Sequence, residues 1–167
     1  MSQQRHSFPP VAAPDAKVLI LGSMPGEESL RLQQYYAFSH NAFWRIMGEL
    51  FSFSSDLPYA ARLQELQKNH IALWVTLSCC IRSGSLDSNI RNAQHNDITG
   101  LLQRCPEIRT IFCNGHAAYN YLKRFQNGLF TREDLQIFYL PSTSPAAARM
   151  NYHQKLGYWK MVAEKCR

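Results

Sequence analysis

The chain alternates short apolar runs with amphipathic segments, and this alternation narrows the possible folds more than any other feature. The four apolar runs span 17–21, 71–77, 109–113 and 135–140, and each has the length of a buried strand. Strands that alternate with helices build a parallel sheet whose two faces are covered by helices. We therefore expect an α/β fold, a three-layer α/β/α sandwich around a four-stranded parallel sheet.

Apolar residues at helical spacing predict helices between and after these runs. The expected helices cover 27–34, a segment after Asn41, 60–69, a segment capped by Asp97, 117–127 and 152–165. Residues 83–96 are too rich in Ser, Asn and Gly to belong to the core, and residues 1–16 are expected to be irregular. Because no linker or repeat interrupts the pattern and 167 residues can bury one core, a single domain over 1–167 is predicted.

The net charge bears on the kind of partner. The chain has 18 Lys and Arg against 12 Asp and Glu, a formal charge of +6, which suits a polyanion such as nucleic acid. A basic chain does not by itself prove such a partner. No apolar run approaches the ~18 residues that cross a membrane, and the first residues carry no hydrophobic signal segment. A cytoplasmic protein without membrane contact is therefore expected.

The cysteine pattern bears on disulfides and metals. The five cysteines are an odd number and include no Cys-x-x-Cys pair, so they fit reduced thiols better than a disulfide framework. The same pattern predicts neither a zinc site nor an iron–sulfur cluster. His40, His116 and His153 also lack the spacing of metal ligands.

Each predicted strand runs into a polar segment rich in Gly, Pro, Ser or Asn: 22–26, 83–89, 114–116 and 141–145. Ligands of open α/β sheets bind beyond the carboxyl ends of the strands, so we expect these four segments to meet at one rim. The first, Gly-Ser-Met-Pro-Gly, is neither a Walker loop nor a dinucleotide fingerprint. Its backbone N–H groups could hold a phosphate or polarise a water, or it could be an ordinary strand-to-helix turn.

Aromatic side chains are dense just before Asn41. Tyr35, Tyr36 and Phe38 form a patch that suits a pocket for a flat heterocycle, whose stacking on an aromatic ring is worth roughly 1–3 kcal/mol. Core packing is the alternative for these rings, and an N-cap is the alternative for Asn41.

Polar side chains of the other rim segments suit a nucleic-acid ligand. Asn114 offers both a donor and an acceptor to the edge of a base, or it caps the next helix. The hydroxyls of Ser142, Thr143 and Ser144 could grip phosphates, or they belong to a plain turn. Asp87 could be a general base or the former of an Asx-turn. Basic residues in or just after these segments, which could equally be scattered surface charge, are Arg82, Arg91, Arg149 and Lys155.

Two motifs, at 22–44 and at 140–145, resemble those of a known protein family in their order and spacing. Gly-Ser-Met-Pro-Gly at 22–26, followed by Tyr-Ala-Phe-Ser-His-Asn-Ala-Phe-Trp at 36–44, is similar to the Gly-x-Asn-Pro-Gly loop and the Asn-x-Phe-Trp segment of mismatch-specific uracil-DNA glycosylases. Leu-Pro-Ser-Thr-Ser-Pro at 140–145 resembles the loop that this family inserts into DNA. Over roughly 17–159, the chain therefore resembles the uracil-DNA glycosylase superfamily.

Two departures from the family pattern point to one branch. Met24 stands where the mismatch-specific enzymes have a water-positioning Asn, and Leu140 stands where other uracil enzymes have a His. The first loop and the segments 83–88 and 113–115 instead resemble the hypoxanthine-DNA glycosylase branch, which uses asparagines on neighbouring loops. This resemblance implies deoxyinosine as the substrate and Asn41 and Asn114 as the catalytic residues.

The resemblance also implies a monofunctional enzyme that needs neither a cofactor nor a metal. Such an enzyme flips the damaged base out of DNA and hydrolyses its N-glycosidic bond, which leaves an abasic site. Asn114 would bond to the base and Asn41 would position the water. The implied base-binding residues are Phe38 or Tyr36 as the stacking ring, with Ser23 and Met24. The implied DNA contacts are Ser142, Thr143, Ser144, Pro145, Ala146 and Arg149. Double-stranded DNA with a deaminated base is the expected partner, single-stranded DNA is a second one, and a monomer is expected.

Three other functions stay open at this point. The chain could be a G:T/U mismatch-specific uracil-DNA glycosylase. Because Met24 cannot position a water, it could also be a lesion-binding module without catalysis. An unrelated α/β enzyme acting on a small phosphorylated or nucleotide substrate is the third alternative.

Overall fold

The central layer of the computed structural model, which describes residues 3–167, is a parallel sheet with the strand order β3-β2-β6-β7. Its strands are β2 (Val18–Gly22), β3 (Ile71–Val75), β6 (Thr110–Asn114) and β7 (Gln136–Leu140). β2 pairs in parallel with β3 and β6, and β6 pairs in parallel with β7. Every residue of β2, β3 and β6 is buried, as expected when helices cover both faces of a sheet.

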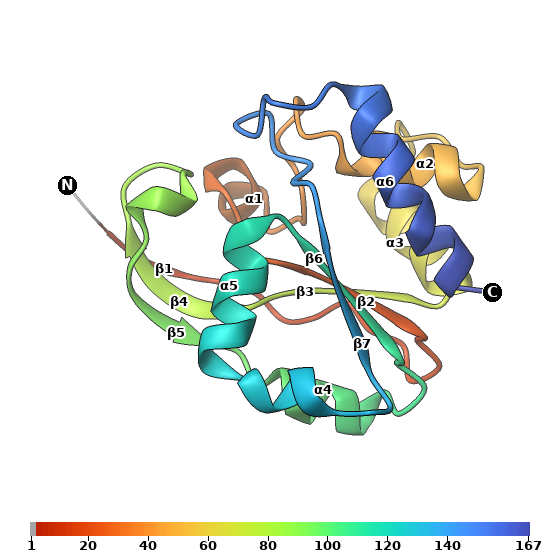
Figure 1. Cartoon of the computed structure of the whole chain (residues 1–167). Coiled ribbons are helices and arrows are strands. Elements are labelled where there is room, and N and C mark those ends of the chain that lie inside the picture. Colours follow the sequence, from red (N-terminus) through yellow and green to blue (C-terminus); the bar gives the residue numbers. More distant parts are fainter. Residues whose placement is uncertain (1–2) are drawn as a thin grey trace.

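Helices form the two outer layers, which confirms the predicted α/β/α fold class (Figure 1). The chain between β2 and β3 carries α1 (Glu27–Leu32), α2 (Phe43–Phe51) and α3 (Tyr59–Lys68), whereas α4 (Ile98–Arg104) and α5 (His116–Phe125) precede and follow β6. The crossover from β2 to β3 runs toward one edge of the sheet, whereas those from β3 to β6 and from β6 to β7 run toward the other edge. The right-handedness of such crossovers therefore places the two helix groups on opposite faces. The last helix, α6 (Tyr152–Lys165), packs against α2.

The predicted helices match the structure closely. The expected helix at 152–165 has the same bounds, and Asp97 caps α4 by accepting a hydrogen bond from the Gly100 N–H at 3.0 Å. The helices expected at 27–34 and 117–127 end two residues earlier, at Leu32 and Phe125.

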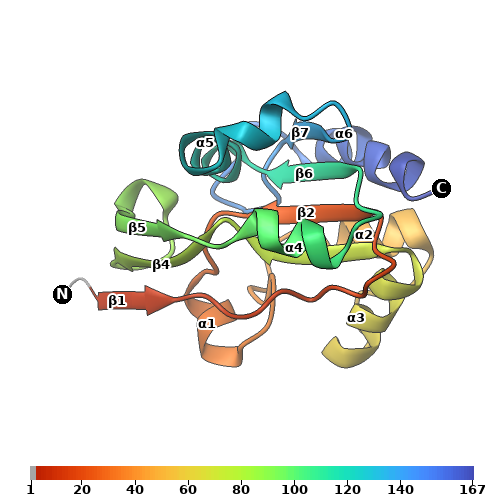
Figure 2. The same ribbon diagram turned by 90° about the horizontal axis from the view of Figure 1, so that it is seen from below.

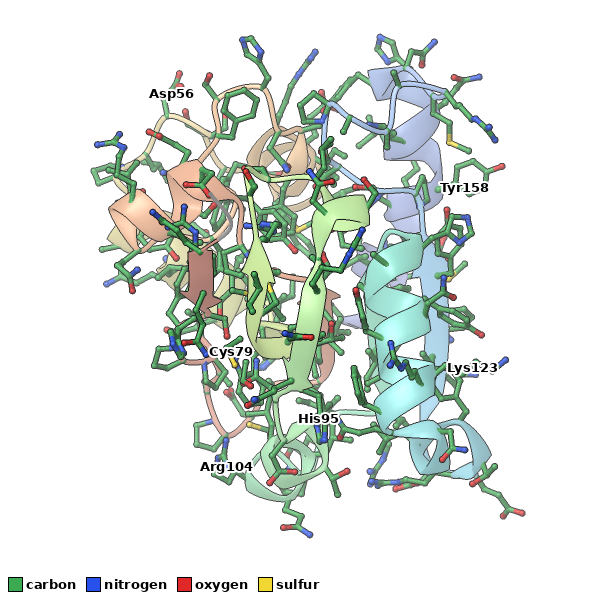
Figure 3. The ribbon with its side chains drawn as sticks, turned by 90° about the vertical axis from the view of Figure 1, so that its left-hand side faces the viewer. Asp56, Cys79, His95, Arg104, Lys123 and Tyr158 are labelled. Carbon is green, nitrogen blue, oxygen red and sulfur yellow. The ribbon has the colours of Figure 1, made fainter. Side chains whose placement is uncertain are left out.

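A second, antiparallel sheet is the main difference from the sequence-based expectation. It has the order β1-β4-β5 and consists of β1 (Gln3–His6), β4 (Leu77–Arg82) and β5 (Arg91–His95). Figures 2 and 3 show it beside the end of the parallel sheet, and Figure 3 labels Cys79 on β4 and His95 on β5. The strand expected at 71–77 therefore ends at Val75, and the chain turns into β4.

The expectation of an irregular 1–16 segment is wrong for β1, and its first two residues lie outside the described part of the chain. Residues 83–96 are outside the core apart from Ile90, as predicted, but they contain β5 and the 3₁₀ turn η1 (Asp87–Asn89). A second 3₁₀ turn, η2 (Asn127–Thr131), follows α5. Because β1 and β5 are polar along their length, they lack the apolar alternation from which strands are predicted.

No helix within residues 3–167 has both the length and the apolar character that crossing a lipid bilayer requires.

Candidate active site

A cavity of about 480 Å³ opens where the strands of the parallel sheet end. All four predicted rim segments contribute to its lining, which confirms that they converge. In Figure 1 these segments occupy the upper part of the molecule, where the chain leaves β2 for α1, β7 for α6 and β4 for β5. The volume lies in the range of sites that enclose a small organic group.

The 22–26 loop is held by the start of β4. The Gly22 carbonyl accepts the Thr76 N–H at 2.8 Å, and the Ser23 carbonyl accepts the Leu77 N–H at 3.1 Å. Met24 is buried in a small apolar cluster that includes Leu77. The Met24 side chain therefore anchors the loop, although it also contributes to the cavity lining.

The hairpin tip, residues 83–89 between β4 and β5, packs against this loop. The Ser23 hydroxyl donates to the Asp87 carboxylate at 2.7 Å, and the Ser85 hydroxyl accepts the Glu27 N–H at 2.8 Å. Arg82 donates to the Pro25 carbonyl and is only 1 % exposed, so it is not a surface charge. Its Nε and Nη1 atoms have no hydrogen-bond partner among the described residues.

Two rings of the aromatic patch, Tyr35 and Tyr36, pack within the protein, whereas the ring of Phe38 is partly exposed. Tyr35 is buried, and its hydroxyl donates to the Pro9 carbonyl at 2.8 Å. The Tyr36 ring stacks on Phe43 with ring centroids 4.0 Å apart. Phe38, by contrast, lines the cavity with 48 % of its surface exposed. Phe38 is therefore the ring with a face available for a flat ligand.

The hydroxyl of Tyr36 is a separate feature of the cavity. It is buried and makes no hydrogen bond within the described part of the chain. Burial raises the pKa of Tyr36 to about 12, against a smaller lowering by the nearby Asn114 amide. A Cβ at Gly22 would lie 3.3 Å from this hydroxyl oxygen, so glycine leaves the room that Tyr36 occupies. An unpaired buried hydroxyl is costly, and such a group is often explained by a ligand or water.

Asn41 combines a structural contact with a free amide. Its Oδ1 accepts the Phe43 N–H at 2.9 Å, but the N-cap of α2 is Ala42, so the alternative of an Asn41 N-cap is wrong. Its Nδ2 has no hydrogen-bond partner among residues 3–167, and the side chain lines the cavity. The contact of Oδ1 with Phe43 therefore leaves the amide nitrogen for a ligand.

Asn114 is tied to the loop that follows β7. Its Nδ2 donates to Thr143 Oγ1 at 3.0 Å, and its Oδ1 accepts the Thr143 N–H at 2.9 Å. The N-cap of α5 is Gly115, so the alternative of an Asn114 N-cap is wrong. Each amide atom keeps a second hydrogen-bonding position for a ligand.

The 141–146 loop is fixed from several sides. The Trp159 indole donates to the Pro141 carbonyl at 2.9 Å, and Lys155 Nζ donates to the Ser144 carbonyl at 3.1 Å. The Ala42 N–H donates to the Thr143 carbonyl at 3.0 Å. Lys155 is buried, and this desolvation lowers its pKa. Lys155 is thus a loop anchor rather than a surface charge.

Most of the predicted site residues line this one cavity: Ser23, Met24, Tyr36, Phe38, Asn41, Asn114, Ser142, Thr143, Ser144, Pro145 and Ala146. Arg149 is exposed and lies outside the lining. Sequence reasoning missed Val75, Glu27, Glu28 and Ser29. The two glutamates follow the 22–26 motif directly, which is a signal that could have identified them. Within residues 3–167, no group of three or more His, Cys, Asp or Glu side chains is placed to hold a metal.

A parallel sheet with a cavity at the carboxyl ends of its strands is an arrangement typical of α/β enzymes. Residues 9–163 match the model of the uracil DNA glycosylase superfamily, and the chain belongs to this superfamily.

Two relatives and one solved structure are similar to the chain over most of its length. The chain is 35% identical over 159 residues to a protein of Methanosarcina acetivorans named hypoxanthine DNA glycosylase, covering 95% of this chain and 97% of that one. A Methanosarcina barkeri protein of the same name is 33% identical over 119 residues, which are 71% of this chain and 75% of the relative. The solution NMR structure of a candidate uracil DNA glycosylase from Methanosarcina acetivorans superposes with a TM-score of 0.84 and 33% identity, over 98% of this chain and 99% of that one.

Proposed function

We propose that the protein is a monofunctional DNA glycosylase that releases a deaminated base, hypoxanthine, from DNA and leaves an abasic site. Membership of the superfamily and the names of its two relatives support this proposal. In the structure, the main support is that Asn41, Asn114 and the exposed ring of Phe38 line one cavity.

Base binding follows from the groups that the cavity leaves free. The face of Phe38 stacks on the flipped base, which contributes roughly 1–3 kcal/mol. Asn114 offers its remaining N–H and lone pair to the edge of the base. The unpaired hydroxyl of Tyr36 gives a further contact at the Asn114 side of the cavity.

The chemistry is a hydrolysis of the N-glycosidic bond. The oxygen of a water bound to Asn41 Nδ2 forms a bond to C1′ of the sugar while the C1′–N9 bond breaks. The electron pair of that bond leaves with hypoxanthine, and amide and backbone donors stabilise the developing negative charge. An amide is a weak base, so orientation of the water is the contribution of Asn41.

DNA binding is assigned to the 141–146 loop and its surroundings. The hydroxyl oxygens of Ser142 and Ser144 accept backbone N–H groups at 3.1 and 3.2 Å, which leaves their O–H groups free to donate to phosphates. Pro145 contacts the DNA, the segment that follows it, 146–149, fills the gap left by the flipped nucleotide, and Arg149 adds a positive charge outside the cavity. We propose that the chain acts as a single unit and a monomer on double-stranded DNA, with single-stranded DNA as a second substrate. A cytoplasmic location stays a prediction.

Base release tests this function directly. Duplexes that carry one hypoxanthine, uracil or xanthine are incubated with the protein, and abasic sites are detected by alkaline cleavage. We expect hypoxanthine release that is lost in Asn41→Ala and retained in Asn120→Ala, an exposed asparagine of α5. Uracil release alone would favour a uracil-specific enzyme.

A lesion-binding module is the outcome that would contradict catalysis. Met24, a buried apolar residue, stands in the first loop where the mismatch-specific enzymes have a water-positioning Asn, and this difference favours the alternative. Lesion-dependent DNA binding without any abasic product would establish it.

A further inference from the structure

We propose that Asp87, on the hairpin tip, is a catalytic carboxylate that takes a proton from the attacking water. This inference rests on the proposed function and adds a residue to it. Asp87 lines the same cavity as Asn41 and Asn114, although it lies in the turn η1 between two strands of the second sheet. The first loop holds no acid, since its central position is the apolar Met24.

The other two acids of the cavity are engaged in ion pairs. Glu27 accepts two hydrogen bonds from Arg5 at 2.7 and 2.9 Å. Glu28 pairs with Arg31 on the same helix. An ion-paired carboxylate is a weaker base, because the neighbouring cation stabilises its charged form.

Asp87 has a different environment. Its Oδ1 accepts the neutral Ser23 hydroxyl, and its Oδ2 has no hydrogen-bond partner among the described residues. The Ser23 contact holds the carboxylate against the 22–26 loop. The unpaired oxygen is therefore the atom available to a water in the cavity.

The charges around Asp87 set its protonation. Burial of the carboxyl group raises the pKa of Asp87, and the Ser23 hydrogen bond and the Arg82 guanidinium lower it by less. Cys80 of β4 and Tyr121 of α5 also face this charge, and burial followed by the Asp87 charge raises the pKa of Tyr121. Burial likewise raises the pKa of Cys80, so neither group adds a negative charge at neutral pH. Asp87 is thus a stronger base than an ordinary aspartate.

The proton balance of the step is complete. The water oxygen forms the bond to C1′, the electron pair of the C1′–N9 bond leaves with hypoxanthine, and the water proton passes to Asp87 Oδ2. Asp87 then gives the proton to solvent or to the released base. General base catalysis of this kind contributes roughly 10²–10⁴-fold to a rate.

The Asp87→Asn variant tests this role because it keeps an oxygen acceptor for Ser23. Release of hypoxanthine is measured in single turnovers at saturating enzyme across a range of pH. For the wild type, the rate should rise with pH as Asp87 loses its proton and then level off. Asp87→Asn should be slower by about 100-fold or more and should lack this rise. Lesion-DNA binding should be unchanged or tighter, because a negative charge near the phosphates is lost.

Two further variants keep the test decisive. Asp56→Asn removes an exposed carboxylate outside the cavity and should leave the rate and the pH profile unchanged. Ser23→Ala keeps Asp87 but removes its hydrogen bond, so the rise in rate should move to higher pH. The shift in the pH dependence of the Ser23→Ala rate therefore tests the role of Asp87 even if Asp87→Asn does not fold.

The possible failures are distinguishable. If Asp87→Asn folds, releases hypoxanthine within about threefold of the wild type and keeps the same pH profile, Asp87 is structural and the glycosylase function stands. If the wild type itself releases no base, the proposed function fails, and the role of Asp87 falls with it.

Discussion

The two walls of the cavity are built in different ways. We call the 141–146 loop the anchored wall, because buried side chains of two elements hydrogen-bond to it: Asn114 of β6, and Lys155 and Trp159 of α6. Every residue of the hairpin wall, 83–89, is exposed as a whole, although the Asp87 carboxyl group itself is desolvated, and the wall meets the 22–26 loop through hydroxyl groups. Substitutions should therefore affect stability strongly on the anchored wall and weakly on the hairpin wall.

The two walls also have different proposed tasks: the anchored wall binds DNA, and the hairpin wall supplies a carboxylate for the reaction. A DNA-binding surface gains from being fixed before binding, because ordering a loop on contact costs free energy. The anchored wall meets this requirement. The hairpin wall carries Asp87, so its chemistry can be changed by substitution without a large cost to the fold.

The largest effect is expected at Asn114. Asn114→Ala removes both hydrogen bonds to Thr143 and leaves the buried Thr143 N–H unpaired, which costs about 1–3 kcal/mol of unfolding free energy. Hypoxanthine release should also fall about 100-fold or more, since a donor to the leaving base is lost. Urea unfolding and single-turnover assays measure the two quantities. An unfolding free energy equal to that of Asn120→Ala would show that the loop is not held through Asn114.

A pair of glycines, one at each wall, gives the sharpest comparison. Gly115 (φ +96) and Gly84 (φ +73) both have a backbone conformation that disfavours alanine. A Cβ at Gly115 would lie 3.0 Å from Ser142 Cβ, whereas a Cβ at Gly84 would meet nothing within 4 Å. We expect Gly115→Ala to lose about 2–3 kcal/mol of unfolding free energy and Gly84→Ala about 1 kcal/mol. Equal losses, measured by thermal unfolding, would contradict the difference between the walls.

A smaller effect on the anchored wall is expected from Thr143→Val, which keeps the shape of the side chain. The substitution leaves the buried Asn114 Nδ2 without its partner and should cost about 1–2 kcal/mol. Thr131→Val is the matched control, because Thr131 is exposed and water can replace its hydroxyl contact with the Gly128 carbonyl. If Thr143→Val has the same unfolding free energy as Thr131→Val, the hydrogen bond between Asn114 and Thr143 does not stabilise the loop, and its other contacts do.

The smallest effect is expected on the hairpin wall. Ser85→Ala removes the acceptor of the Glu27 N–H, a contact that water can replace. The unfolding free energy should change by less than about 0.5 kcal/mol, and hypoxanthine release by less than about twofold. A loss as large as that of Thr143→Val in the same unfolding assay would mean that both walls are equally anchored.

Much of the fold could be predicted because the parallel sheet is uniformly apolar. The strands that became β2, β6 and β7 were expected within about one residue of their bounds, since each buried run is bordered by polar residues. β1 and β5 were not expected, because backbone pairing with β4 rather than side-chain burial holds them. Backbone pairing of polar strands leaves no apolar pattern in a sequence.

The cavity was located correctly, but the contacts of its residues were not predictable. The meeting of 22–26, 114–116 and 141–145 follows from the parallel strands that precede them, which is why Asn114 lines the cavity as expected. Asn41 lines the cavity as well, although it lies outside these segments. The burial of Arg82 and the hydrogen bond between Ser23 and Asp87 depend on the hairpin, whose position follows from the unpredicted second sheet.

The small sheet has a further consequence for solubility. β4 is its most apolar strand, and an open apolar strand edge can pair with another chain. Here β4 lies between β1 and β5, which expose polar residues such as Gln4, His6 and Arg91 at the two sides of the sheet. The contact between Ser7 and Ser78, 71 positions apart, shows how distant the protecting segment is in the chain. Closing so long a loop is slow, so β4 is unprotected on one side until β1 docks, and self-association should compete with refolding in that interval.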